Sequence, residues 1–174
     1  YFYDNEKVTL HVPTKNGYKF VAWYQSETFD IGTNISNITN TIGDVVLYAR
    51  FIAVDQEGYY IITSVAQFNE LADPLMMTQN ARLYADLDFN YEAPAQIGNF
   101  NMQYNPLTAN ASIYINKKGY VLSGDAYRGI FDGNKHYICG YQLASSNGYY
   151  GLFNATKNAT IKNLGIIPAE MQNV

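Results

Sequence analysis

Short runs of alternating apolar residues, separated by Gly, Asn, Asp and Pro, extend over most of this chain. Such runs predict β-strands, because successive side chains of a strand lie on opposite faces and turn residues end each strand. The predicted strands cover residues 8–12, 18–25, 45–52, 81–89, 111–115, 127–131, 136–141 and 160–166. Only one short helix is predicted, so we expect a mainly β fold.

The composition indicates a folded chain with a substantial core. With 174 residues and 48% hydrophobic residues, the chain is long enough for one large or two small domains. Aromatic residues make up 16% of the chain and include 17 Tyr, whereas charged residues make up only 15%. Tyr packs well on strands while its hydroxyl meets water, so this composition favours β-sheets.

Charge and motif content exclude several function classes. The net charge of -4 and the pI near 5.0 argue against nucleic acid or an anionic membrane as a partner, because both require clustered basic residues. No apolar run reaches the roughly 18 residues of a membrane helix, so we expect no membrane insertion. The sequence contains no zinc, phosphate-loop or dinucleotide motif, so we expect no metal and no cofactor.

The character of the sequence changes at residues 55–58. We predict a first module at residues 1–54, a linker at 55–58 and a second module at 59–174. No signal segment opens the chain at Tyr1, so we expect that a targeting segment was removed or that the sequence was cut from a longer protein. Residues 30–43 are rich in Asn, Thr, Ser and Gly and predict a long connection or a weak, short element.

The strand at residues 18–24 carries apolar groups on both faces. Strict alternation places Tyr18, Phe20, Ala22 and Tyr24 on one face, and Val21 and Trp23 on the other. A strand with two apolar faces favours a central place in its sheet. Trp23 is predicted to be a core residue, and the alternative is a sugar-stacking platform.

The run GYKFVAWY at residues 17–24, followed by GDVVLYARF at 43–51, resembles the Listeria-Bacteroides repeat, the B-repeat of internalins. The resemblance covers residues 1–53. It implies a small β-grasp-like module of secreted and wall-attached bacterial proteins. Ala22 stands where the family usually has Gly, and Phe51 stands where it usually has Trp. Both differences preserve size or aromatic character, so the implied fold is unaffected.

The second module opens with a helix signal. Ser64 and Gln67 have the spacing of a capping box, and Asp73-Pro74 ends the pattern. The apolar residues between them recur at helical spacing: Val65, Phe68, Leu71 and Ala72. We therefore predict one short amphipathic helix over residues 64–72.

Further along, the second module resembles GLUG-motif and haemagglutinin-like surface proteins. The entry to their right-handed parallel β-helix is similar to YII at 60–62, the short helix, LYADLDF at 83–89 and QIGN at 96–99. Their rungs are similar to YRGIFDGNKHYI at 127–138, GLF at 151–153 and ATIKNLGI at 159–166. The resemblance implies stacked coils in which Ile130, Phe153 and Ile161 point inward and residues 132–134 form a corner.

Two parts of this pattern are irregular. Residues 100–123 depart from the rung pattern, and we expect an insertion or a hairpin there. The predicted helix is expected to shield the first coil, whereas nothing comparable follows the last one. Stacked coils need neighbours and caps, so we expect the natural polypeptide to continue beyond residue 174.

Acidic residues are the candidates for chemistry, because parallel β-helices also include polysaccharide lyases and hydrolases. Asp86 and Asp88 are two residues apart, so on one strand their carboxylates share a face and are candidates for a cation site or an acid–base pair. The alternative, which we favour, is a polar strand edge. Asp125, Arg128 and Asp132 are the remaining candidates.

The nucleophile patterns are weaker still. His11 and His136 lie in different modules, and neither has a Ser-His-Asp pattern around it. Cys139 is the one cysteine, and we expect it to be a buried apolar residue. The sequence thus assigns no catalytic residue and no metal ligand.

We predict an extracellular fragment of a bacterial surface or secreted protein that acts in adhesion or ligand display. Stacked modules would offer a Tyr- and Asn-rich face to a host protein or glycan. The alternatives are the accessory or opening part of a β-helix carbohydrate-active enzyme, and a ligand-free spacer. The sequence assigns no ligand-binding residues and no oligomeric state.

Overall fold

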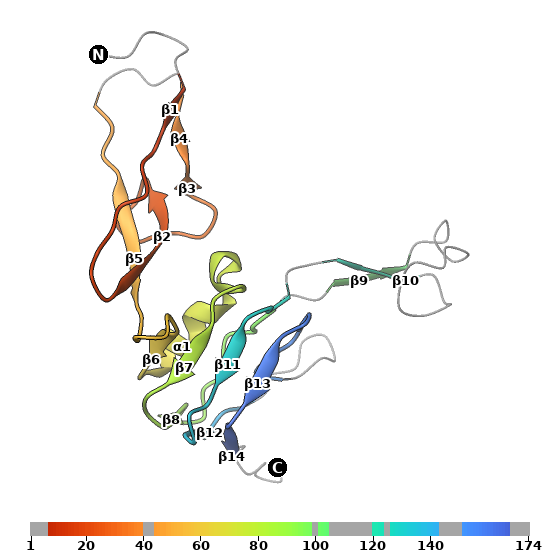
Figure 1. Cartoon of the computed structure of the whole chain (residues 1–174). Coiled ribbons are helices and arrows are strands. Elements are labelled where there is room, and N and C mark those ends of the chain that lie inside the picture. Colours follow the sequence, from red (N-terminus) through yellow and green to blue (C-terminus); the bar gives the residue numbers. More distant parts are fainter. Residues whose placement is uncertain are drawn as a thin grey trace. The chain divides into compact units, whose positions relative to one another are not determined.

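A computed structural model describes residues 7–39, 44–98, 101–104, 120–123, 126–142 and 151–167 (Figure 1). In these residues the fold is mainly β, with one short α-helix and two short 3-10 helices. The chain divides into two compact units, Tyr1–Ile61 and Ile62–Val174. We call them the first and the second unit.

The first unit is built around β2 (Tyr18–Tyr24). Its neighbours are β3 (Asn34–Ile35) on one side and β5 (Tyr48–Ala53) on the other, both antiparallel to it. A separate antiparallel pair consists of β1 (Val8–Thr9) and β4 (Asn37–Ile38). The prediction that residues 18–24 form a central strand is therefore confirmed.

A β-bulge in β2 makes the predicted assignment of its faces wrong. Phe20 pairs with Phe51 and Ala22 with Arg50, so Val21 is an extra residue opposite β5. A bulge of this kind shifts the alternation of all later side chains. Phe20 therefore lies on the same face as Trp23, with ring centroids 5.7 Å apart.

The other face of this sheet is the buried one. Ala22, Tyr24, Arg50 and Ile52 lie on it, and all four are buried. Arg50 Nη1 donates a hydrogen bond to the hydroxyl of Tyr24 at 3.3 Å. The small core of the first unit thus depends on Tyr24, as predicted, whereas Trp23 lies on the opposite, half-buried face.

A tight turn occupies the predicted linker at residues 55–58. The Asp55 carboxylate accepts hydrogen bonds from the backbone N–H groups of Glu57 and Tyr59, each at 2.9 Å. Gly58 adopts a positive φ of 82°, which favours glycine. An antiparallel bridge from Val54 to Tyr60 then closes the turn.

The predicted capping box begins the helix of the second unit. Ser64 Oγ accepts from Gln67 N, and Gln67 Oε1 accepts in return from Thr63 N at 2.8 Å. α1 spans Val65–Asn69 and continues as the 3-10 turn η1 (Glu70–Ala72). A second 3-10 turn, η2 (Pro74–Met76), follows after Asp73, and the sequence did not predict it.

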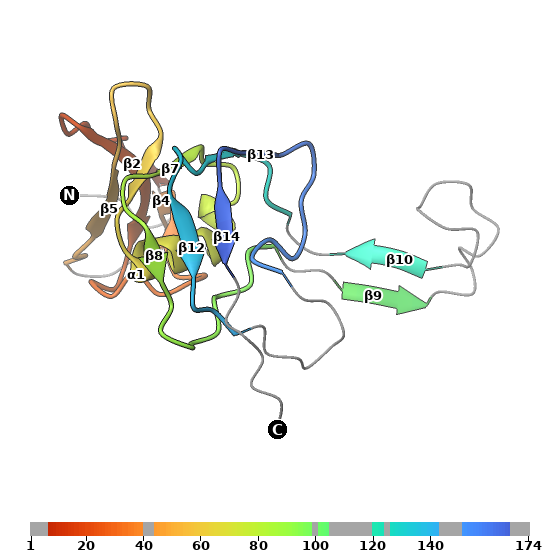
Figure 2. The same ribbon diagram turned by 90° about the horizontal axis from the view of Figure 1, so that it is seen from below.

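The second unit contains three segments that each consist of two consecutive short strands separated by a bend, and we call each segment a strand pair. They are β7 (Ala81–Leu83) with β8 (Leu87–Asp88), β11 (Ile130–Asp132) with β12 (Tyr137–Cys139), and β13 (Thr160–Lys162) with β14 (Gly165–Ile167). The first members pair in parallel in the order β7-β11-β13 (Figure 1), with β6 (Tyr60–Ile62) next to β7. The second members pair in parallel in the order β8-β12-β14 (Figure 2).

Two of the predicted strands are each two strands in the structure. The runs at 81–89 and 160–166 both bend in the middle, so their halves belong to different sheets. Asn163 takes a positive φ of 53° at the second bend, a conformation that Asn tolerates well. The corner predicted at residues 132–134 is confirmed, because β11 ends at Asp132 and Asn134 has a φ of 50°.

The inward residue of β11 is Phe131, and the prediction of Ile130 is wrong. Phe131 has no exposed surface and stacks between Ala81 and Ile161 on the neighbouring strands. Ile130 pairs with Thr160, which is exposed. Ile161 has the predicted inward register, yet 44% of its surface is exposed. The alternation of β11 is thus displaced by one residue from the predicted one, whereas the register of Ile161 in β13 is as predicted.

Aromatic rings fill the interior of the second unit. Phe68 of α1 lies 5.8 Å from both Phe89 and Phe131, measured between ring centroids, and the three rings meet edge to face. Phe153 lies 5.1 Å from Phe131 and 5.4 Å from Tyr127. α1 therefore packs its apolar side onto the stacked strand pairs, as the sequence predicted.

A hairpin interrupts the stacked strands. β9 (Asn101–Tyr104) and β10 (Tyr120–Ser123) pair antiparallel over four residue pairs. The hairpin expected between residues 100 and 123 is therefore confirmed. The strand predicted at 111–115 lies outside the described residues.

The stack of Phe131 gives a first test. We expect Phe131→Ala to lower the free energy of unfolding by about 3 to 5 kcal/mol, because it leaves a cavity among packed rings. Ile130→Ala is the matched control at the adjacent, half-buried position, where about 1 to 2 kcal/mol is expected. Urea unfolding followed by circular dichroism measures both values. Equal losses would contradict the observed register.

Candidate functional site on the stacked strands

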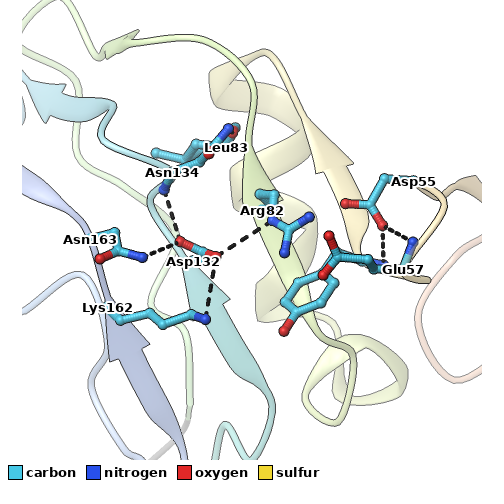
Figure 3. Close-up of polar contacts among 9 residues, drawn as sticks. Asp55, Glu57, Arg82, Leu83, Asp132, Asn134, Lys162 and Asn163 are labelled. Carbon is cyan, nitrogen blue, oxygen red and sulfur yellow. Dashed lines mark hydrogen bonds and ion pairs between the residues drawn. The ribbon is translucent and has the colours of Figure 1, made fainter.

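A ladder of alternating charges crosses the sheet β7-β11-β13 (Figure 3). It consists of Arg82, Asp132 and Lys162, which are paired residues on the three neighbouring strands. Asp132 Oδ2 lies 3.5 Å from Arg82 Nε and 3.5 Å from Lys162 Nζ. Opposite charges on adjacent strands stabilise their pairing. We refer to these three residues as the charge ladder.

The second carboxylate oxygen of Asp132 is also occupied. Oδ1 accepts from the backbone N–H of Asn134 and from the side-chain amide of Asn163, both at 3.0 Å (Figure 3). Burial alone would raise the pKa of this carboxyl, but the hydrogen bonds and the charge of Lys162 outweigh burial and hold the pKa below its ordinary value. Asp132 is therefore an anion that joins three strands and is unsuited to proton donation at neutral pH.

A second polar group lies at the corner between β7 and β8. Asp86 Oδ1 accepts from His136 Nδ1 at 3.0 Å and from the backbone N–H of Tyr137 at 3.1 Å. The hydrogen bond from Tyr137 N, helped by His136, holds the pKa of Asp86 below its ordinary value despite some desolvation. Because a carboxylate only accepts, Nδ1 of His136 carries the hydrogen of this bond. The other ring nitrogen, Nε2, takes no part in this bond, and the His136 side chain is 31% exposed.

Asp86 and Asp88 are both exposed and flank the buried Leu87, in keeping with the predicted shared face, although only Asp88 belongs to a strand. Asp86 lies in the bend between β7 and β8, whereas Asp88 ends β8. Asp88 Oδ1 accepts from the backbone N–H of Asn90 at 2.9 Å, which orders the next corner. In the part of the chain that the structure describes, no three His, Cys, Asp or Glu side chains are grouped so that they could hold a metal ion.

The other predicted candidates are not brought together. Arg128 is exposed, and its backbone N–H donates to the carbonyl of Met77. The partners of Asp132 are Arg82 and Lys162 instead, and Asp125 lies outside the described residues. Cys139 is half-buried, and burial and the charge of Asp88 raise the pKa of its thiol. A raised pKa disfavours the reactive thiolate.

Trp23 belongs to the half-buried face of the first unit. Its indole N–H donates to the carbonyl of His11 at 2.8 Å, and its ring meets Phe20 edge to face. These contacts use the polar atom of the side chain and fix the ring. His11 therefore contributes its backbone to Trp23 and lies in a different unit from His136.

Sequence reasoning missed Arg82, Lys162 and Asn163. Aligning ARL at 81–83, FDG at 131–133 and IKN at 161–163 would have placed the three charged residues in one column. The signal is that each of the three strands has an apolar residue followed by a charged one, and that the sign of this charge alternates from strand to strand. The pairing of Asp86 with His136, which is fifty positions away in sequence, has no comparable signal.

Comparison with known proteins finds a family match for one part of the chain. Residues 1–50 match the family model of the Listeria-Bacteroides repeat domain. This repeat family is typically found in bacterial surface proteins. Searches of curated proteins and of solved structures found no match. The resemblance of residues 59–167 to GLUG-motif proteins stays a prediction. Among the described residues, no helix is long and apolar enough to cross a membrane.

The charge ladder gives a second test. We expect Asp132→Asn to lower the free energy of unfolding by about 1 to 3 kcal/mol at pH 7, since the amide keeps the size of the side chain but removes the negative charge that faces Arg82 and Lys162. Asp88→Asn is the matched control, because Asp88 is an exposed strand residue of the same type. Urea unfolding measures both variants, and an equal loss in the control would contradict the ladder.

The same variant has a predicted pH dependence. The folded pKa of Asp132 lies below the unfolded value of about 3.9. Its contribution to stability is therefore complete above the unfolded pKa and is lost as the pH falls through the folded pKa. The difference between wild type and Asp132→Asn should shrink in unfolding curves recorded at successively lower pH. A difference independent of pH would show that the charge of Asp132 is irrelevant.

Proposed function

We propose that this chain is an extracellular segment of a bacterial surface or secreted protein that displays a ligand-binding surface for adhesion. The observation that carries the proposal is the match of residues 1–50 to the Listeria-Bacteroides repeat. The charge of -4 supports it as well, since a nucleic-acid partner would require a basic surface.

In this proposal the first unit is a β-grasp-like repeat, and the second is the beginning of a right-handed parallel β-helix. The in-register parallel pairs β7-β11-β13 and β8-β12-β14 support stacked coils. The edge-to-face packing of Phe68 on Phe131 supports α1 as the element that covers the coil interior. Stacked coils extend in one direction and present a long side surface.

Adhesion by such a surface would depend on many weak contacts. A second contact made by the same tethered molecule is favoured by its high effective concentration. Tandem modules therefore bind more tightly than a single module with the same surface. The host partner in this proposal is a matrix protein or a glycan.

The proposal is tested with the full 174-residue chain, alone and as a tandem dimer, against immobilised host matrix proteins and glycans. We expect the tandem form to bind at least one of them about tenfold or more tightly than the single chain, through effective concentration. The two forms share every surface, so each is the control of the other. Failure of both to bind any target would contradict adhesion and favour a ligand-free spacer.

A non-catalytic role is part of the proposal. The two oxygens of Asp132 are taken up by neighbouring side chains and backbone, which supports a structural role for that carboxylate. The competing reading is the opening part of a polysaccharide lyase or hydrolase, and the Asp86–His136 contact is the observation that favours it. A carboxylate that orients an imidazole is a common arrangement for a general base.

Product release from polyuronates discriminates the two readings. We expect no new reducing ends and no unsaturated product from the wild-type chain. Release that is abolished by Asp86→Ala or by Arg128→Ala, and kept in Asp88→Asn, would overturn the non-catalytic proposal. The comparison with Asp88→Asn separates a role of these particular residues from a general effect of removing a charge.

A further inference from the structure

The sheet β8-β12-β14 (Figure 2) includes one large exposed aromatic residue, Tyr137. Ile138 points inward and has no exposed surface, so its neighbours Tyr137 and Cys139 point outward. Tyr137 is 39% exposed, although it lies in the middle strand of the sheet. A large ring in such a position normally packs on the side chain of the paired residue.

The residue paired with Tyr137 on β14 has no side chain. It is Gly165, and a Cβ atom added there would lie 3.0 Å from the Cβ of Tyr137. The backbone of Gly165 has no positive φ, so its conformation does not require glycine. The effect of glycine at this position is to leave the flank of the Tyr137 ring towards β14 uncovered.

Two polar groups are fixed in place next to Tyr137: Asp86, just before the neighbouring strand β8, and His136, just before β12. Asp86 accepts from both His136 Nδ1 and Tyr137 N, so the carboxylate and the imidazole are held in one orientation. Both remain partly open to solvent, with side-chain exposures of 44% and 31%. Nε2 of His136 and the carboxylate of Asp86 can therefore receive hydrogen bonds from a ligand next to the ring.

We propose that Tyr137, His136 and Asp86 form a binding site for an uncharged sugar. A sugar ring has an apolar C–H face and a rim of hydroxyl groups. The electron-rich face of Tyr137 attracts polarised C–H groups, and the paired Gly165 contributes no side chain that would cover the ring from β14. Hydroxyl groups at the rim then donate to His136 Nε2 and Asp86. The inference rests on the proposed ligand-display function and names the ligand class.

Charge selects among sugars. The negative charge of Asp86 raises the pKa of the Tyr137 phenol, with smaller contributions from burial and from Asp88. The ring thus stands in a negative potential, which repels uronates and other acidic sugars. Neutral hexoses and N-acetylhexosamines are the ligands that fit. This selectivity is opposite to that of a polyuronate lyase.

The site is shallow, so a single copy binds weakly. Ligands that remain largely in contact with water gain little from burial and reach only roughly millimolar affinity. Repeated sugar units on a surface would compensate through effective concentration. Weak, multivalent sugar binding is compatible with adhesion.

The test uses saturation-transfer NMR on the full chain with three probes: cellotriose, tri-N-acetylchitotriose and trigalacturonate. We expect binding of at least one neutral probe and no binding of trigalacturonate. Tyr137→Ala should weaken the neutral probe about fivefold to tenfold, which corresponds to the loss of one aromatic contact. Tyr137→Phe should retain the affinity because it keeps the ring. Tyr18→Ala, which removes a strand Tyr of similar exposure from the first unit, should have no effect.

A second variant guards against a folding artefact. Gly165→Ala places a methyl group against the Tyr137 flank and should weaken sugar binding while the circular dichroism spectrum is unchanged. The inference is overturned if no neutral probe binds, if Tyr137→Ala binds as well as wild type, or if trigalacturonate binds equally. Host matrix protein captured by the tandem dimer without any sugar binding would leave the proposed function standing and remove this site.

Discussion

The register between β7, β11 and β13 is the constraint on which the second unit depends. In one register Phe131 stacks between Ala81 and Ile161, and on the opposite face Asp132 stands between Arg82 and Lys162. A slip of one residue would turn Asp132 inward and Phe131 outward, because side chains alternate along a strand. Burial of an unpaired carboxylate is costly. The apolar stack and the charge ladder therefore specify the same alignment.

Features set by neighbouring residues could be predicted from the sequence. The capping box of Ser64 and Gln67 and the corner at residues 132–134 follow from local capping or turn chemistry, and the hairpin of β9 and β10 is expected from a break in the repeated pattern. The central place of β2 follows from apolar groups on both of its faces. In each case the deciding interaction lies within a few residues or within one repeated pattern.

Features set by long-range pairing could not be predicted. The bulge at Val21 depends on how β5 aligns with β2, and it reverses the faces of all residues after it. The choice of Phe131 over Ile130 as the inward residue depends on stacking with Ala81, fifty positions away. The contact of Asp86 with His136 arises only when two corners meet. At Phe20 and Val21, and again at Ile130 and Phe131, two adjacent residues are both apolar. Alternation alone therefore cannot decide which of the two faces the core.

The two outer faces of the stacked strands differ in how completely their polar groups are used. On β7-β11-β13, the carboxylate of Asp132 is surrounded by two cations and two donors, so this face holds the strands together. On β8-β12-β14, Gly165 leaves the Tyr137 ring uncovered, and Asp86 orients His136 without enclosing it. A surface that binds a ligand needs groups that are ordered yet accessible. Because the first face secures the register, the second can keep its aromatic ring and its hydrogen-bonding atoms available for recognition.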